Sequence, residues 1–253
     1  MKIKLFLLLL CSWYLPSVLK AQNTRIIDEN IISWNALFIN YKLTEKWGVH
    51  GEFQLRRSDF LNNPQQNLFR AGLETKIHEQ VLLRIGGAYA DTYPYGKVPL
   101  QASARLFPEY RVFQMVQVNN PLGGVNLTHR FILEQRWIGS FINTASPKTD
   151  NYTYLNRARY MARVEYAFKN IYKGKSVPFI AGYDEIMIGF GKNIGQNIFD
   201  QNRLGILIGL DLQKRIRAEA GFISQSLLFG RLLDDKHVIQ TNQGLIINTY
   251  IKL

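Results

Sequence analysis

Arginine and glutamate recur at every second position in several segments of this 253-residue chain. Glu134 and Arg136 lie two residues apart, and Arg157, Arg159 and Arg163 share one parity. A planar guanidinium can hold a carboxylate through two hydrogen bonds, so such side chains on neighbouring strands can pair in ladders. Charged side chains around an enclosed passage can also select ions by their sign. The chemistry indicated first is therefore electrostatic.

Sixteen charged residues stand on the polar side of alternating segments, and we predict that they form a charge network facing an enclosed interior. They are Glu52, Arg56, Arg70, Glu74, Glu109, Arg111, Arg130, Glu134, Arg136, Arg157, Arg159, Arg163, Glu165, Arg203, Arg217 and Glu219. Arg84 shares their parity. One interpretation is structural, with Arg and Glu pairs filling the interior. The other is a narrow pore with a positive lumen that favours small anionic solutes, although the mixture of signs weakens it.

Catalytic interpretations are weaker, and we assign no catalytic residue. An outer-membrane lipid-modifying hydrolase is the alternative function, because some barrels of that membrane carry a Ser-His-acid set on the outer wall. His129 is an outward-facing histidine within an expected strand, but no serine stands at a matching outward position. Glu109, Glu134 and Glu185 could be paired carboxylates for glycoside hydrolysis. Neighbouring arginines would keep these carboxylates ionised and make them poor proton donors.

The sequence predicts no metal site and no cofactor. His50, His78, His129 and His237 lie far apart, without the spacing of metal ligands. The acidic pair within Tyr183–Glu185 is too small a cluster to indicate calcium.

The elements that must position the charged residues are β-strands. Trp47–Ser58 alternates between apolar and polar residues, which is typical of a strand with one apolar face. The pattern recurs in about eleven segments. Because closed bacterial barrels usually have an even number of strands, we predict ten to twelve and favour twelve. The missing strand would lie near Gln22–Asn30 or within Tyr93–Leu106.

The N-terminus is typical of a cleaved signal peptide. Lysines precede an apolar stretch, Leu5–Leu10, and cleavage is expected after Ala21. This divides the chain into a signal peptide, 1–21, and a barrel, 22–253. The single cysteine, Cys11, falls in the first part, so the predicted mature chain has no disulfide. After the signal no apolar run is long enough for a spanning helix, and a membrane protein without such helices must be a closed barrel.

Composition supports a transmembrane, antiparallel, up-and-down β-barrel of the all-β class. Aromatic residues make up 13% of the chain, which suits membrane-interface girdles. The formal net charge of +12 could indicate nucleic-acid binding, but the basic residues are spread singly at alternate positions and the chain is expected to be exported. A soluble β-sandwich or lipocalin-like barrel is the alternative fold, since alternation alone does not distinguish inside from outside.

Several stretches resemble an uncharacterised family of Gram-negative outer-membrane barrel proteins, domain of unknown function 2490. They are Glu109–Gln114, His129–Trp137, Asn156–Tyr160, Tyr183–Glu185 and Phe199–Leu204. The resemblance covers most of the expected mature chain and implies a barrel in the outer membrane of a Gram-negative bacterium, without any activity. Expected partners are outer-membrane lipid and lipopolysaccharide, and no nucleic acid. The alternating last strand, ending in Leu253, also resembles the signal read by the barrel assembly machinery.

Overall fold

The described part of the chain is all-β. A computed structural model describes residues 25–143, 145–168, 176–195, 198–212 and 215–253. The predicted signal peptide, 1–21, lies outside these residues. Within them the chain forms eleven strands and no helix: β1 (Arg25–Lys42), β2 (Trp47–Ser58), β3 (Asn63–His78), β4 (Val81–Thr92), β5 (Phe107–Leu122), β6 (Val125–Ser140), β7 (Asn151–Ala167), β8 (Ser176–Phe190), β9 (Phe199–Leu212), β10 (Ile216–Leu233) and β11 (Lys236–Lys252). A search of the same residues for helices long and apolar enough to cross a membrane found none.

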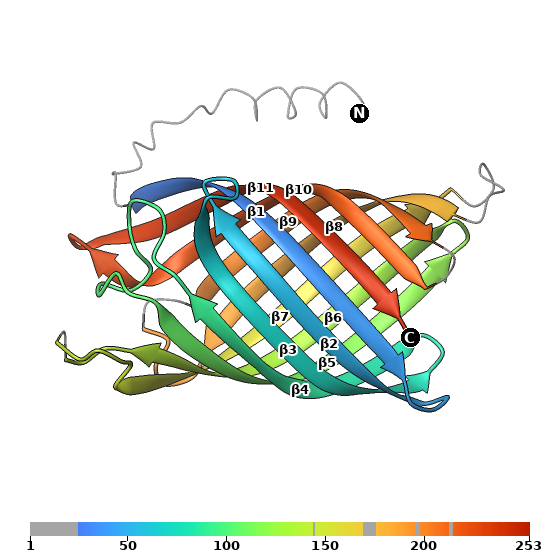
Figure 1. Cartoon of the computed structure of the whole chain (residues 1–253), viewed down its shortest axis with the longest axis horizontal. Coiled ribbons are helices and arrows are strands. Elements are labelled where there is room, and N and C mark those ends of the chain that lie inside the picture. The colour runs from blue at the N-terminus through green and yellow to red at the C-terminus, as the bar shows by residue number, and fades with distance from the viewer. Residues whose placement is uncertain (1–24, 144, 169–175, 196–197, 213–214) are drawn as a thin grey trace, which may run out of the picture.

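The strands close into a single barrel (Figure 1). Each strand pairs antiparallel with the next, whereas β1 and β11 pair in parallel from Arg25↔His237 to Asn40↔Lys252. An odd number of strands forces this result, because the first and last strands of an eleven-strand meander run in the same direction. Parallel pairs form regular ladders, so closure does not require an even number.

The preference for twelve strands, and for purely antiparallel pairing, was therefore wrong. In the described residues of the two proposed places, 25–30 and 93–106, the structure has no extra strand. Residues from Arg25 onward belong to the beginning of β1, which is longer than the sequence pattern suggested, and no strand is assigned between β4 and β5. The direct count of alternating segments, eleven, matches the structure.

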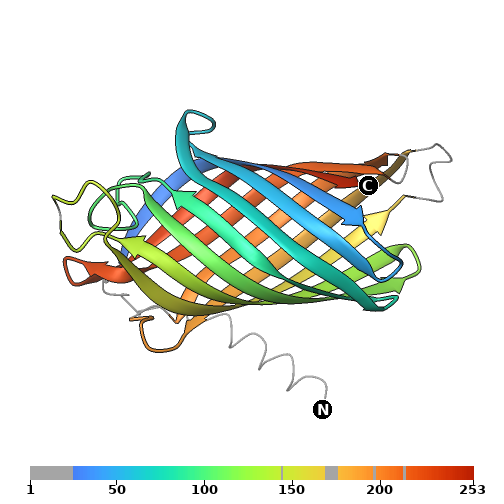
Figure 2. The ribbon, with the colours of Figure 1, turned by 60° about the horizontal axis from the view of Figure 1, so that its bottom comes forward.

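The two mouths of the barrel differ in the length of their connections (Figures 1 and 2). At one end, which we call the short-turn mouth, the described connections include residues 43–46, 79–80 and 123–124. At the other, the long-loop mouth, they include residues 93–106 and 141–150. The odd strand count places Arg25 and Leu253 at opposite mouths (Figure 1).

The alternation of side chains separates the two faces of the wall. Ile206 and Ile208 on β9 are 63% and 68% exposed, whereas Arg203 on the same strand is buried. Because the sheet is closed, the buried set faces the interior and the exposed apolar set faces outward. The division is incomplete, since the interior also holds apolar clusters. In one of them Tyr183 lies against Gly205, where an added Cβ would come within 2.1 Å of the tyrosine ring.

Candidate functional site

An ion-pair network occupies the middle of the barrel, centred on Glu134 of β6. This side chain is fully buried, at 0% exposure. It lies 2.6 Å from Arg157 and 2.8 Å from Arg159, both on β7, and 3.6 Å from Arg70 on β3. Strands β3 and β6 are three places apart in the wall, so the contact between Arg70 and Glu134 crosses the interior.

Glu109 forms a second centre of this network. Both of its carboxylate oxygens accept hydrogen bonds from Arg111, each at 2.7 Å, and Arg136 of β6 donates another. Arg136 and Arg157 both approach Asp200 of β9, at 3.7 and 2.6 Å. The two centres are thus linked through Asp200, which contacts one arginine from each of them, and we call the whole set the central network.

Two of its carboxylates were not among the predicted residues. Glu185 lies 2.8 Å from Arg159 and 3.0 Å from Arg130. Its strand alternates ambiguously, so its facing could not be assigned from sequence. Asp200 is displaced by a β-bulge: Gln201 pairs with Met187 and Phe199 with Ile188, which leaves Asp200 unopposed. A bulge turns two successive side chains towards one face, and simple parity does not reveal it.

Further ion pairs lie nearer the short-turn mouth. Glu219 of β10 accepts a 2.6 Å hydrogen bond from Arg163 of β7, again across the interior. Glu165 accepts a hydrogen bond from Arg217, and Glu74 pairs with Arg84 at 2.6 Å. Among the described residues, fifteen of the sixteen predicted positions lie within 4.0 Å of an oppositely charged side chain: all except Arg56.

Arg56 has neutral partners instead. Its guanidinium donates to Gln54 at 2.6 Å and to Gln66 at 2.9 Å, and its central carbon lies 4.0 Å from the centroid of the Trp34 ring. Arg203 lies 4.9 Å from the same centroid. Both guanidinium groups therefore lie near the same Trp34 ring, and their central carbons are separated by no more than the sum of these two distances. Arg56 thus adds a positive charge that no carboxylate in the described residues contacts directly.

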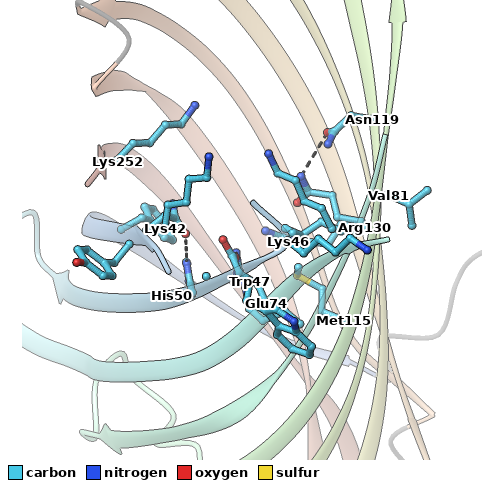
Figure 3. A pocket seen from close by; sticks show the side chains of 18 of the residues that line it. Lys42, Lys46, Trp47, His50, Glu74, Val81, Met115, Asn119, Arg130 and Lys252 are labelled. Carbon is cyan, nitrogen blue, oxygen red and sulfur yellow. Dashed lines mark hydrogen bonds and ion pairs between the residues drawn. The ribbon is translucent and has the colours of Figure 1, made fainter. Parts of the chain in front are cut away.

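Cavities lie on both sides of the central network. Towards the short-turn mouth, adjoining cavities of about 650 and 430 Å³ share lining residues such as Glu52, Arg70 and Arg130, and together we call them the short-turn vestibule (Figure 3). The long-loop vestibule, of about 440 Å³, opens at the other end. Arg56, Arg111 and Arg203 line both vestibules. These three arginines therefore stand at the boundary between the two spaces.

The loop of residues 93–106 lies across the long-loop mouth. Asp28 of β1 accepts hydrogen bonds from the backbone nitrogens of Lys97 and Val98, each at 3.2 Å. Arg231 of β10 donates to the carbonyl of Pro99 at 2.7 Å, and Gln101 donates to that of Gly139 on β6 at 2.7 Å. The loop is thereby attached to widely separated parts of the wall.

Burial of Tyr95 in this loop raises the pKa of its phenol to about 12. The phenol therefore stays protonated at physiological pH, with its oxygen 3.0 Å from the amide nitrogen of Asn242 on β11. The sequence pattern offered Tyr93–Leu106 as a place for a missing strand and gave no reason to expect this segment over the mouth.

The residues considered for catalysis have other partners. The Nδ1 atom of His129 lies 2.8 Å from the hydroxyl of Tyr160, and no serine or carboxylate contact is found for it in the described residues. Glu109, Glu134 and Glu185 are each held by two or more arginines. In the part of the chain described by the structure, no group of three or more His, Cys, Asp or Glu side chains is arranged to hold a metal ion.

Comparison with known proteins identifies a family but no activity. A family model described as "Protein of unknown function (DUF2490)" matches residues 32–229. No curated protein and no solved structure matches the chain. The matched range contains all of the stretches on which the sequence resemblance was based.

Proposed function

This chain belongs to the DUF2490 family of proteins of unknown function, and we propose that it is an outer-membrane β-barrel with a narrow, anion-leaning passage. The proposal has two parts, insertion in the outer membrane of a Gram-negative bacterium and conduction through the interior. The outer face of the barrel wall supports insertion, and the inner face supports conduction.

The outer face supports insertion. Large apolar side chains are exposed along it, including Phe69 at 55% and Ile208 at 68%. An apolar band of this kind is stable when acyl chains cover it. Exposed aromatics stand near both ends of the strands: Trp47 and Tyr166 near the short-turn mouth, Tyr152 near the long-loop mouth. Rings at these levels suit the two lipid headgroup regions, including lipopolysaccharide on the outer side.

The observation that carries the passage is the position of Arg56, Arg111 and Arg203 at the boundary of the two vestibules. An anion crossing that boundary would meet three guanidinium groups, one of which has no carboxylate partner in the described residues. A cation would be repelled at the same point. Arg111 and Arg203 also contact the buried carboxylates of Glu109 and Glu185, so we expect the passage to be narrow and to conduct only small ions.

The test is conductance of the full-length protein in planar bilayers under a salt gradient. We expect small, discrete steps with a reversal potential on the anion-selective side. Cation selectivity would contradict the proposal. Silence from a protein shown to be folded and inserted would overturn the passage and leave the structural interpretation, a barrel filled by its ion pairs.

Insertion is tested separately by fractionation of the producing cells. We expect the protein in the outer-membrane fraction, resistant to extraction by carbonate, with heat-dependent mobility on gels as folded barrels show. Recovery in the soluble periplasmic fraction would overturn this part of the proposal.

A further inference from the structure

We propose that the short-turn vestibule binds a single-chain amphiphile with an anionic head, of the long-chain carboxylate class. The acyl tail would lie against an apolar stripe inside the barrel, and the carboxylate would lie nearer the mouth among cationic side chains. This inference requires the barrel but does not require conduction through it.

The apolar stripe consists of Leu82, Phe113, Met115 and Ile132, which pack together on the interior side of β4, β5 and β6. All four line the larger cavity of the short-turn vestibule, and Met115 is among the side chains drawn in Figure 3. Met115 pairs with Ile132 in the sheet register, so the stripe continues from one strand to the next. These side chains form an apolar wall of the cavity, although Phe113, Met115 and Ile132 are only 2%, 3% and 5% exposed. A hydrocarbon chain gains from contact with such a wall.

The polarity of the wall changes along the strands. On β5, the interior side passes from Phe113 and Met115 to Gln117 and Asn119 as the strand approaches the short-turn mouth. On β6, Ile132 is followed by Arg130 in the same direction. Within the vestibule, both strands are thus apolar next to the central network and polar nearer the mouth. A molecule with one apolar and one polar end fits this order in a single orientation.

The charge around the mouth favours an anionic head, because seven lysine and arginine side chains line the larger cavity against four glutamates. Lys46 and Lys252 line the same cavity, and neither makes an ion pair within the described residues (Figure 3). The Nε atom of Arg130 and the Nε2 atom of His50 are buried without a hydrogen-bond partner in that part of the chain. The His50 side chain as a whole is only 3% exposed, and Glu52 is 3.6 Å from its Nε2 atom. The lysine ammonium groups and the Arg130 guanidinium are donors, and a carboxylate supplies acceptors. His50 adds no donor, because its Nδ1 atom lies 2.7 Å from the amide oxygen of Asn40 and the neutral ring then leaves Nε2 as an acceptor.

The experiment uses the full-length protein in lipid nanodiscs and a dodecanoate that carries a photoreactive diazirine in its tail. Peptides from β5 and β6 that contain Met115 and Ile132 should be labelled. Unlabelled dodecanoate should compete, whereas dodecyltrimethylammonium, which has the same tail and a cationic head, should compete at least about tenfold more weakly. Labelling confined to the outer wall, or equal competition by both amphiphiles, would overturn the proposal.

Two isoleucines on β6 provide a matched pair of variants. Ile132 belongs to the stripe, whereas Ile138 is an interior residue of the same strand that lines the long-loop vestibule. We expect Ile132→Gln to weaken dodecanoate competition about tenfold and Ile138→Gln to leave it unchanged. Equal losses of dodecanoate competition in the two variants would contradict the placement of the acyl tail against the apolar stripe.

A second variant leaves the side chains inside the barrel unchanged, so its effect does not depend on how the interior packs. Lys46→Gln combined with Lys252→Gln changes side chains at the mouth and should weaken dodecanoate competition about threefold to tenfold. No change in this double variant would overturn the placement of the head. Specific labelling by a protein that is silent in bilayers would support this inference while overturning the passage. Conductance without specific labelling would overturn this inference alone.

Discussion

The two vestibules are closed by different means. At the long-loop mouth, the backbone of the 93–106 loop is hydrogen-bonded to the side chains of Asp28 and Arg231, and the Gln101 side chain of the loop donates to the carbonyl of Gly139. At the short-turn mouth the described connections are brief, and the vestibule is bordered by side chains such as Lys46 and Lys252. Backbone hydrogen bonds fix a segment in place, whereas long lysine side chains rearrange within nanoseconds.

This difference implies that access to the interior is unequal from the two sides. A solute at the short-turn mouth meets mobile charges and an open vestibule before it reaches the central network. A solute at the long-loop mouth first meets a fastened loop. The two vestibules stay separate only while the central network lies between them. A substitution within this network is therefore expected to have the largest effect.

Glu134→Gln should destabilise the barrel most. The amide cannot balance Arg157 and Arg159, which would remain buried next to one another with less compensating charge. Loss of one partner in a buried ion pair costs roughly 3–5 kcal/mol. Unfolding in urea from detergent micelles measures the free energy of unfolding.

Glu74→Gln is the matched control, because Glu74 contacts only Arg84 among the described arginines and is more exposed. We expect a loss of about 1 kcal/mol or less for this variant. Similar losses in the free energy of unfolding would mean that ion pairs in the middle of the barrel and near the short-turn mouth contribute equally to stability. The description of Glu134 as the centre of the network would then be wrong.

Asp28→Asn should release the loop from the long-loop mouth. The asparagine amide would present a donor where two backbone nitrogens now donate to a carboxylate, so at least one of these hydrogen bonds is lost. The expected cost is about 1–3 kcal/mol, confined to the loop. Faster hydrogen exchange at Lys97 and Val98, together with larger conductance steps, measures the release.

The control for this loop is Asp59→Asn, in the turn between β2 and β3 at the same mouth. Asp59 is exposed and accepts a hydrogen bond from Asn63 next to its own turn, and no hydrogen bond or ion pair joins its side chain to the 93–106 loop among the described residues. Exchange at Lys97 and Val98 should not change in this variant. If neither variant alters exchange in the loop, the contrast between the two mouths is not supported.

Sequence periodicity predicted the strands because they follow a local rule, the alternation of side chains, and the same rule placed the charged residues on one side of that alternation. It missed Asp200, whose facing depends on a bulge formed with a neighbouring strand. It missed the position of the 93–106 loop, which depends on Asp28 and Arg231 from distant strands. The strand count was missed for another reason: a preference for even numbers was applied to a barrel that closes through a parallel pair.

The interior contents were also only partly predictable. Parity placed the charged residues on one side, but the apolar stripe around Met115 stands on that same side of β5. Alternation indicates which way a side chain points and does not require every inward residue to be polar. The partners of each charge were not predictable either, because contacts such as Arg163–Glu219 join strands three places apart.

Arg56→Gln should change ion selectivity without a large loss of stability. Its partners are neutral, so the substitution leaves no carboxylate unpaired, although it removes the contact with Trp34. We expect the anion-to-cation permeability ratio to fall by roughly threefold to tenfold, measured as a shift in reversal potential.

Arg57→Gln is the control one residue away. Arg57 bonds Asn67 on the adjacent strand and lines neither vestibule. The reversal potential measured with Arg57→Gln should equal that of the unmodified protein. A shift of the same size in both variants would indicate that overall charge sets selectivity, and the boundary between the two vestibules would lose its special role.

The smallest effect is expected in the 141–150 loop, which shares the long-loop mouth. It touches the 93–106 loop where the Arg105 guanidinium lies 4.0 Å from the centroid of the Phe141 ring, but Asp150 holds its backbone from within the loop. The Asp150 carboxylate accepts hydrogen bonds from the backbone nitrogens of Ile142 at 2.8 Å and Asn143 at 3.1 Å. These bonds lower its pKa below the ordinary value of 3.8. A group with a lowered pKa stabilises the folded loop above that ordinary value, and the contribution is lost as the pH falls through the folded pKa.

Protection of the Ile142 and Asn143 amides should therefore persist at pH 5 and disappear only in stronger acid than an ordinary aspartate would require. Asp150→Asn should abolish this pH dependence and speed exchange at the two amides, while exchange at Lys97 and Val98 stays the same. Hydrogen exchange followed by mass spectrometry reports both loops in one experiment. If Asp150→Asn also released the 93–106 loop, the two loops would form a single cover, and the long-loop mouth would be closed by a larger unit than the Asp28 contacts define.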